Sequence, residues 1–525
     1  MENFVNREVE LQLVAEKFST LVENSDLVQT PIIEFYGVGG IGKTTVLRRI
    51  EQLCHDRSLA SIWADASQSV PQVSQEIIQQ IQHYNVSFTP KNEDLSEQSI
   101  HAARALLARE PLIFLIDSLD AASEEQLGWI EHMLRDLIEG NRLFAILASK
   151  RIVSFDQTLV VARRLTTARL KPFDQENCLS FVSKLDQEIE PEIRDIIFAW
   201  THGYPLAVNV MVQAIKESKL DPRKEQDQRQ ILAIMSEQVI NRGVFSRIVQ
   251  EPDDLAWCQT MLSLFSVPRR CNLSIMQKMV ERFAHPYRLG SSLAYMSLPK
   301  RINQTTDVLN WNPAKAGFSV EAPIRHMFLV KMKLEESATF TAIHRFLAIT
   351  NRQLVDEVSG TDRVRYWLEY LYHCAHCEEG TLLLQIVEKT MRQIVAEPVE
   401  YLLQFHEDFV SDEELKTVLD VHSNMILSLI YRQFAIINKQ SALEAKEMER
   451  VFYLQEFFYY VILDPVIIDL SLFLKETVQQ IVKEESAHIC FKLYEALLRD
   501  TRIKEKLGES IVVFSSLLGA SSQGG

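Results

Sequence analysis

The sequence contains little proline and little glycine, with 16 residues of each among 525. Both residues favour turns and interrupt helices, so long loops and low-complexity linkers are not expected. Apolar residues make up 47% of the chain and charged residues 24%, which is ordinary for a globular protein. The composition therefore predicts a helix-rich protein, and the length favours about three or four domains over a single core.

The sequence also lacks sustained runs of lysine and arginine, and its formal net charge is −16. Such a chain repels nucleic acid and anionic membrane surfaces, so neither is an expected partner. The most apolar late segment, VFYLQEFFYYVILDPVIIDLSLFL, contains Glu456, Asp464 and Pro465 and does not have the pattern of a membrane span. The beginning, MENFVNREVE, has no apolar core like that of a signal peptide. We expect a soluble, cytoplasmic protein.

The seven cysteines are scattered, which favours reduced thiols over a disulfide framework. In YHCAHC, the side chains of His373, His376 and Cys377 would share one face of a helix and could hold a metal. No second ligand pair lies nearby in the sequence, so packing within a helical hairpin is the preferred interpretation. The aromatic stretch 452–460 has no basic neighbours, so we interpret it as helix packing rather than a platform for nucleic-acid bases.

Short apolar runs alternate with amphipathic stretches over the first 170 residues. The predicted strands are 31–36, 61–66, 111–117, 143–149 and about 165–170. Apolar strands alternating with helices indicate a parallel sheet covered on both faces. Beyond about residue 172 the strand signal fades. We predict helices over 174–185, 191–200 and 205–218, and an exposed connection over 221–230.

The stretch GVGGIGKTT (37–45) follows a predicted strand and opens a predicted helix, and it fits the phosphate-binding pattern G-x-x-x-x-G-K-[ST]. Glycines allow a loop to wrap so that backbone N–H groups face a phosphate, and the following helix adds its positive N-terminal dipole. Lys43 should bridge the β- and γ-phosphates, and the Thr44 hydroxyl should ligate Mg²⁺. The predicted nucleotide-binding residues of this loop are Gly37, Gly39, Gly40, Gly42, Lys43, Thr44 and Thr45.

A second acidic element is expected at the end of a neighbouring strand. LIFLIDSLD places Asp117 after five apolar residues, where it would share the Mg²⁺ with Thr44. Asp120 could polarise the attacking water or could cap the next helix. Many fast ATPases have a glutamate directly after the first aspartate, and here that residue is Ser118, which favours slow hydrolysis. In AILASKR, the strand ends at Ser149, and Arg151 is placed to reach the γ-phosphate.

With these motifs placed, the chain resembles the signal-transduction ATPases with numerous domains (STAND), the group that includes NB-ARC and NACHT proteins. GVGGIGKTT has almost the form of their loop, LIFLIDSLD is similar to the acidic strand of the NACHT branch, and LASKR resembles the strand that ends in their sensor arginine. FVNREVEL looks like the opening segment of the family, which implies that Arg7 and Val5 pack near the adenine. HGYPLA resembles the G-x-P motif of the helical lid, which implies that Pro205 stacks on the adenine.

The resemblance also implies a winged-helix domain. In many relatives a histidine near its end contacts the ADP β-phosphate and locks the closed state. In FSVEAPIRHM, Arg325 matches the usual arginine, Glu321 falls where the histidine would be, and His326 is displaced. Whether Glu321 or His326 acts as the latch stays open.

The predicted architecture is an α/β P-loop NTPase with an ASCE-type parallel sheet, followed by three further domains. The expected parts are a nucleotide-binding domain (1–171), a helical lid (172–250), a winged-helix domain (251–339), an all-α, helical-repeat-like domain (340–512) and a flexible tail (513–525).

The function that these expectations define is an ATP/ADP- and Mg²⁺-binding molecular switch. It would hydrolyse ATP slowly and signal by nucleotide exchange and oligomerisation, with sensing or output through the C-terminal helices or a separate protein partner. The alternative is an AAA-type mechanochemical ATPase that loads or remodels a protein partner. That class should show fast turnover and a glutamate base, and Ser118 argues against it.

Overall fold

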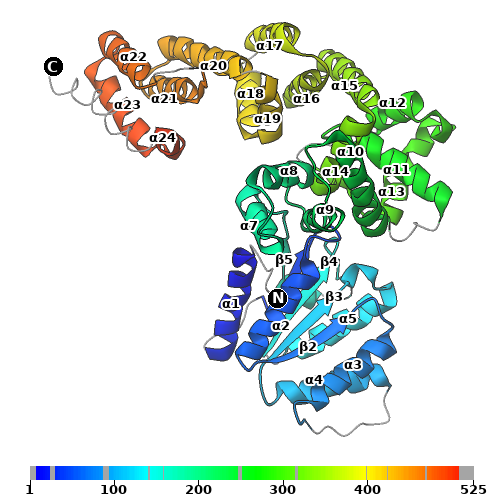
Figure 1. Ribbon diagram of the computed structural model, residues 1–525. Coiled ribbons are helices and arrows are strands. Elements are labelled where there is room, and N and C mark those ends of the chain that lie inside the picture. The colour runs from blue at the N-terminus through cyan, green and yellow to red at the C-terminus, as the bar shows by residue number, and fades with distance from the viewer. Residues whose placement is uncertain are drawn as a thin grey trace. The chain divides into compact units, whose positions relative to one another are not determined.

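The computed structural model describes the chain with several gaps. The described residues are 7–23, 30–86, 94–139, 142–155, 157, 159–245, 251–313, 317–397, 399–422, 424–466 and 470–507. The chain divides into two compact units, Met1–Glu336 and Ser337–Gly525 (Figure 1).

The first unit is built on a five-stranded, wholly parallel sheet with the order β2-β3-β4-β1-β5. Its strands are β1 (Ile32–Tyr36), β2 (Ala60–Asp65), β3 (Leu112–Asp117), β4 (Leu143–Ser149) and β5 (Leu165–Arg169). Strand β4 lies between β1 and β3, which is the ASCE order. All five predicted strands are therefore confirmed. The continuous apolar runs of β3 and β4 are typical of parallel strands buried on both faces, whereas the edge strands β2 and β5 are less buried.

Helices cover both faces of this sheet (Figure 1). They are α1 (Glu8–Glu23), α2 (Lys43–Asp56), α3 (Val70–Gln82), α4 (Leu95–Leu107), α5 (Glu124–Ile138) and the short α6 (Leu159–Arg164). The ring of Phe144 in β4 meets Phe18 of α1 edge-on at 5.8 Å. The next residue of β4, Ala145, belongs to the apolar cluster formed with α3, α4 and α5. Successive strand residues thus contribute to opposite layers, as the pleat requires.

A group of helices follows the sheet. They are α7 (Gln175–Leu185), α8 (Pro191–Thr201), α9 (Pro205–Ser218), α10 (Glu225–Met235) and the π-helix η2 (Ser236–Val244). The predicted helices at 174–185, 191–200 and 205–218 are confirmed. The prediction of a connection over 221–230 is wrong in its second half, because α10 begins at Glu225. Glu225 and Asp227 lie in its first turn, where carboxylates are stabilised by the helix dipole.

The last part of the first unit combines helices with one antiparallel hairpin. Its elements are α11 (Pro252–Ser266), α12 (Leu273–Phe283), the 3₁₀ turns η3 (His285–Tyr287) and η4 (Ser292–Ser297), α13 (Leu298–Thr306), β6 (Leu309–Asn312), β7 (Gly317–Val320) and α14 (Ala322–Glu335). Cys271 pairs with Phe318 of β7 and so adds a third short segment to the hairpin. Helices followed by such a hairpin have the element order of a winged-helix domain.

The described part of the second unit contains ten helices. They are α15 (Ser337–Glu357), α16 (Thr361–Cys377), α17 (Gly380–Val395), α18 (Val399–Ser411), α19 (Glu413–His422), α20 (Asn424–Glu444), α21 (Glu447–Leu463), α22 (Leu470–Glu484), α23 (Ala487–Arg499) and α24 (Thr501–Leu507). The most extensive packing is between two pairs of helices adjacent in sequence, α15 with α16 and α20 with α21, and α21 also packs on α23. The aromatic stretch 452–460 lies in α21, and most of it is buried in the core, so its interpretation as packing is confirmed.

The YHCAHC motif lies in α16. His373 is fully buried, and its Nδ1 lies 2.9 Å from Nδ1 of His344 in α15. The ring of His376 also packs on His344, with centroids 4.3 Å apart. The motif therefore packs inside a helical hairpin, as predicted.

Candidate functional site

The glycine-rich loop joins β1 to α2 and adopts a backbone that only glycine takes readily. Gly40 has φ 76° and Gly42 has φ 102°, both in the left-handed region. Helix α2 begins at Lys43, and no side chain caps its N-terminus. The first backbone N–H groups of α2 therefore remain available to an anion, and the helix dipole favours negative charge there. The loop has the geometry of a phosphate site.

The side chain of Lys43 bonds to the backbone of the glycine-rich loop. Its Nζ donates hydrogen bonds to the carbonyl oxygens of Gly37 at 2.7 Å and Val38 at 3.0 Å. The pKa of Lys43 is lowered to about 8, mainly by burial and to a smaller extent by the neighbouring Lys150, while Asp120 and Asp117 act in the opposite direction. A phosphate beside this ammonium would favour its charged form.

Thr44 and Asp117 lie together, as their positions in the sequence predict. The Thr44 hydroxyl donates to Oδ2 of Asp117 at 2.7 Å, and Oδ1 of Asp117 accepts from the backbone N–H of Ser118 at 2.8 Å. Hydroxyl and carboxylate oxygens are the ligands that Mg²⁺ prefers, and the ion usually takes few of them from the protein and the rest from phosphates and water. In the described part of the chain, no group of three or more His, Cys, Asp and Glu side chains could hold a metal. The Thr44–Asp117 pair fits Mg²⁺ bound together with a nucleotide.

Asp120 lies in the 3₁₀ turn η1 (Leu119–Ala121), and it does not cap α5. Ser123 caps α5 instead and forms a capping box with Gln126. The alternative that Asp120 is a helix cap is therefore wrong. The Asp120 carboxylate accepts from the backbone N–H of Lys150 at 2.8 Å and lies 3.8 Å from its ammonium.

The two basic residues after β4 point to different partners. The guanidinium of Arg151 lies 3.5 Å from the carboxylate of Asp307, which follows α13, and the Arg151 side chain is 69% exposed. Lys150 lies beside the loop, where its Cε would be 3.8 Å from a Cβ placed on Gly39. The sequence pattern identified Arg151 and missed Lys150. Both residues follow β4 directly, and the sequence alone does not tell which of the two side chains the backbone directs toward the loop.

Arg7 connects three segments of the first unit. Its guanidinium donates to the carbonyl oxygens of Ile41 at 3.0 Å and Lys171 at 2.9 Å, and it lies 5.4 Å from the ring centroid of Phe173. The side chain is 6% exposed. Arg7 thus ties the N-terminal segment to the phosphate loop and to the segment after β5. Val5, the other predicted residue of this segment, lies outside the described residues.

Helix α9 begins at Pro205, and the residues on either side of this proline contact the phosphate loop. The hydroxyl of Tyr204 donates to the carbonyl oxygen of Gly39. A Cβ on Gly40 would lie 2.7 Å from Cβ of Leu206. Burial raises the pKa of Tyr204, so its hydroxyl stays protonated as a donor. The G-x-P pattern identified Pro205, whereas Tyr204 and Leu206 had no signal in the sequence beyond their position beside it.

The turn before α9 requires a glycine at position 203. Its φ is 68°, and a Cβ there would lie 1.9 Å from the carbonyl oxygen of Phe173, whose own N–H donates to the Gly203 carbonyl at 2.9 Å. No other residue fits so close to a neighbouring backbone. The glycine therefore fixes the start of α9 against the segment after β5.

Both candidate latch residues of the last segment make contacts outside it. Glu321, just before α14, accepts from Arg169 at the end of β5 at 2.5 Å and from Asn310 at 2.6 Å. His326 donates from Nε2 to the carbonyl oxygen of Ala199 in α8 at 2.7 Å, and its ring stacks on His202 at 3.8 Å. Glu321 therefore connects to the sheet, and His326 connects to the end of α8.

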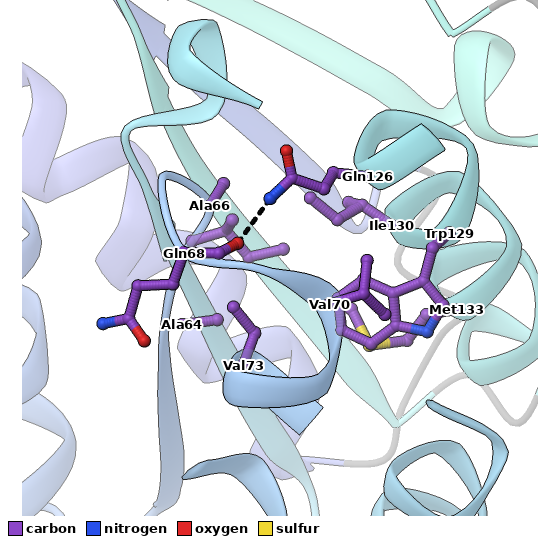
Figure 2. Close-up of a pocket in the computed structure, with 10 residues that line it drawn as sticks. Ala64, Ala66, Gln68, Val70, Val73, Gln126, Trp129, Ile130 and Met133 are labelled. Carbon is purple, nitrogen blue, oxygen red and sulfur yellow. Dashed lines mark hydrogen bonds between the residues drawn. The ribbon is translucent and has the colours of Figure 1, made fainter. Parts of the chain in front are cut away.

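A small pocket between β2, α3 and α5 is a separate feature (Figure 2). Its volume is about 10 Å³, which is room for about one water molecule. The Gln126 amide reaches across it and donates to the carbonyl oxygen of Gln68, while Trp129 and Met133 close one side (Figure 2). This pocket is too small to be the nucleotide site.

The sheet order, the glycine loop before α2 and the Thr44–Asp117 pair define a P-loop NTPase. Residues 11–185 match the family of the NB-ARC domain, so this nucleotide-binding part is a STAND-class P-loop NTPase. The family resemblance seen in the motifs is confirmed. No curated protein sequence matches the chain significantly.

Several solved structures are similar to this chain at low sequence identity. The Orc1 protein of Aeropyrum pernix in complex with DNA matches with 15% identity and a TM-score of 0.36, over 62% of this chain and 92% of that one. A STAND protein with a tetratricopeptide repeat sensor from Pyrococcus horikoshii matches with 13% identity and a TM-score of 0.29, over 99% and 74%. AMPPCP-bound DnaA from Aquifex aeolicus matches with 15% identity and a TM-score of 0.32, over 58% and 90%. Such low TM-scores carry no conclusion about this chain.

None of the helices in the described part of the chain combines the length and the apolarity that crossing a bilayer requires.

Proposed function

We propose that this protein is a cytoplasmic, nucleotide-operated switch that keeps ADP under a closed lid and changes state when ATP and Mg²⁺ replace it. The supporting observation is the direct contact of the lid with the phosphate loop. Tyr204 bonds to Gly39, and Leu206 packs on Gly40. A phosphate that changes the path of this loop must also move the start of α9. The loop and the lid thus form one two-state element that a nucleotide can bias.

The side chains of the site have separate roles in this proposal. Lys43 would hold the β- and γ-phosphates, and Thr44 with Asp117 would hold Mg²⁺, which neutralises phosphate charge when it is bound. Arg7 and Pro205 would border the adenine. The remaining loop residues, from Gly37 to Thr45, would supply backbone N–H donors.

Arg151 would link the γ-phosphate to the winged-helix domain. Its guanidinium pairs with Asp307 at 3.5 Å, so an arginine drawn to a γ-phosphate has to leave that partner. ATP would therefore weaken a contact that ADP leaves intact. The ion pair between Glu321 and Arg169 would be the second contact that holds the winged-helix domain closed.

Slow hydrolysis follows from the carboxylates at the site. Ser118 stands where fast ATPases have a glutamate, and the Asp120 carboxylate is engaged by Lys150. A general base needs a carboxylate that can accept the proton of the attacking water. We therefore expect a turnover well below about 1 s⁻¹, under the enzyme median of about 10 s⁻¹.

The test begins with the nucleotide that co-purifies with the protein and with the oligomeric state before and after exchange into ATP and Mg²⁺. The switch predicts ADP in a monomer that assembles when ATP is bound, with signalling through the C-terminal helices or a partner protein. Lys43→Ala should lose nucleotide, and Lys300→Ala, an exposed lysine on α13, should keep it. Steady-state turnover well above about 1 s⁻¹ would favour a mechanochemical ATPase instead. Normal nucleotide binding by Lys43→Ala would overturn the site itself.

A further inference from the structure

Lys150 lies at the carboxyl edge of the sheet, between the glycine-rich loop and the Thr44–Asp117 pair. It follows Ser149 of β4, and Ser149 pairs in register with Tyr36 of β1, directly before the loop. On its other side β4 pairs with β3, which ends at Asp117. Because parallel strands end at the same edge, Lys150 leaves the sheet where a phosphate held by the loop would meet the Mg²⁺ that bridges its β- and γ-oxygens.

The backbone at this position is held from two sides. The Asp120 carboxylate accepts from the N–H of Lys150 at 2.8 Å. The carboxylate of Glu34, a fully buried residue of β1, accepts from the Ser149 hydroxyl at 2.6 Å and from the N–H of Val153 at 3.0 Å. These bonds fix the path of the segment after β4, and with it the direction in which the Lys150 side chain leaves the backbone.

The Lys150 side chain lies beside the loop with its ammonium donors unused. Its Cε would be 3.8 Å from a Cβ placed on Gly39, and the two residues before Gly39 accept from the Lys43 ammonium. Its Nζ lies 3.8 Å from Oδ2 of Asp120, which is beyond hydrogen-bonding distance, and it makes no hydrogen bond to any other residue that the structure describes. Since the side chain is 31% exposed, a phosphate at the loop can reach these donors.

The charges at this edge favour an additional phosphate. Burial is the main cause of the lowered pKa of Lys43, and the charge of Lys150 adds to it, while Asp120 acts in the opposite direction. The two ammonium groups are thus close enough to repel each other, and an anion between them stabilises both. Arg151, the other basic residue after β4, lies 3.5 Å from Asp307 instead.

We propose that Lys150 is a specificity residue of the nucleotide site, whose ammonium donates hydrogen bonds to the γ-phosphate and so favours ATP over ADP. The proposal deepens the proposed function and rests on it, because it requires a nucleotide at the loop. Lys150 can meet the phosphate without leaving Asp120, since an ammonium presents several donors on a flexible stem. Arg151 has to leave Asp307 first. Lys150 would therefore distinguish the two nucleotides before the winged-helix contact opens.

The experiment compares the binding of ADP with that of AMPPCP, an ATP analogue that is not hydrolysed, to the full chain by calorimetry with Mg²⁺ at pH 7. Lys150→Met should weaken AMPPCP about ten- to hundredfold, the effect of a hydrogen bond to a charged group, and should change ADP by less than about threefold. Lys150→Arg keeps the charge and should recover most of the AMPPCP affinity. Lys216→Met is the matched control and should change neither, because Lys216 also lies near an aspartate, at 3.6 Å from Asp186, but in the last turn of α9.

A further variant distinguishes phosphate binding from a purely structural ion pair. Asp120→Asn keeps an oxygen that can accept from the Lys150 N–H and removes a negative charge near the γ-phosphate, so the affinity for AMPPCP should stay the same or rise. If Lys150 and Asp120 only supported the segment after β4, Lys150→Met and Asp120→Asn would weaken AMPPCP alike. That result would overturn the proposal.

The outcomes also separate this proposal from the proposed function. If the wild type binds neither nucleotide, both are wrong. If it binds both nucleotides and Lys150→Met lowers the two affinities equally, or lowers neither, the role of Lys150 is excluded and the nucleotide site stands. A loss that is specific to AMPPCP, is recovered by Lys150→Arg and is absent in Lys216→Met supports the proposal.

Discussion

The hydroxyl of Tyr204 donates a hydrogen bond to the carbonyl oxygen of Gly39, and this bond joins residues 165 positions apart. It brings the start of α9, which is part of the proposed lid, onto the loop that would hold phosphate. Since Leu206 packs on Gly40 at the same place, the lid cannot move without leaving the loop. The predictions below test this coupling and the contacts around it.

Replacing Tyr204 by phenylalanine should accelerate nucleotide release. The substitution keeps the ring and removes one hydrogen bond, which is worth about 0.5–1.5 kcal/mol, so the dissociation rate of a fluorescent ADP analogue should rise about two- to tenfold in stopped-flow measurements. Tyr295→Phe is the control, because Tyr295 is equally buried in the first unit and its hydroxyl accepts from Leu289, away from the loop. Equal release rates for the two variants would remove Tyr204 from the lid mechanism.

Breaking the pair between Glu321 and Arg169 should also speed release, but by less. The Arg169 side chain is 51% exposed, and such pairs contribute about 0.2–1 kcal/mol, so a double-mutant cycle with Glu321→Ala and Arg169→Ala should show a coupling in that range. The coupling should shrink at high salt. The pair Arg352–Asp356 of α15, exposed and 2.8 Å apart, provides a control cycle that should leave release unchanged. Additive effects of the two substitutions would exclude Glu321 as a latch.

The magnesium dependence of ATP binding should depend on Asp117. Asp117→Asn keeps the shape of the side chain and removes its charge, so the gain in affinity that Mg²⁺ brings should fall by about 1.5–3 kcal/mol, as measured by calorimetry with and without EDTA. Affinity in EDTA should change little. Asp65→Asn is a matched control, because Asp65 ends the neighbouring strand and pairs in register with Asp117. A similar loss in both variants would argue against a specific Mg²⁺ ligand.

The affinity for ADP should fall as the pH rises above about 8. The pKa of Lys43 is lowered to about 8 without nucleotide, and a bound phosphate raises it. Binding above that pH therefore requires uptake of a proton, which costs up to about tenfold in affinity per pH unit. Lys43→Arg should show a flat profile between pH 8 and 10, because a guanidinium stays charged. A flat profile in the wild type would show that Lys43 does not meet the phosphate.

The lowered pKa of Lys43 also makes the stability of the folded chain depend on pH. The unfolded chain holds the Lys43 proton up to about pH 10.4, whereas the folded chain loses it near pH 8. Between these values the unfolded state binds more protons, so the contribution of Lys43 to stability rises with pH. Without nucleotide, chemical denaturation should show Lys43→Met gaining stability over the wild type at pH 7 and losing that advantage by pH 10.

The sequence determined the sheet and the chemistry of the phosphate loop. Parallel strands buried on both faces require continuous apolar runs, and such runs occur at the central strands β3 and β4, whereas the edge strands β2 and β5 have mixed sequences. The loop needs glycines followed by Lys43 and Thr44, and Asp117 follows its strand directly, so these residues are tied to local patterns. These residues could therefore be identified from the sequence without knowledge of any long-range contact.

Only the tertiary structure decided which distant side chains meet this loop. Lys150 lies beside it and Arg151 turns to Asp307, although the two are adjacent in the sequence. Tyr204 and Glu321 find partners 165 and 152 residues away. Such contacts depend on how separate helices and strands pack, and no local periodicity encodes that packing.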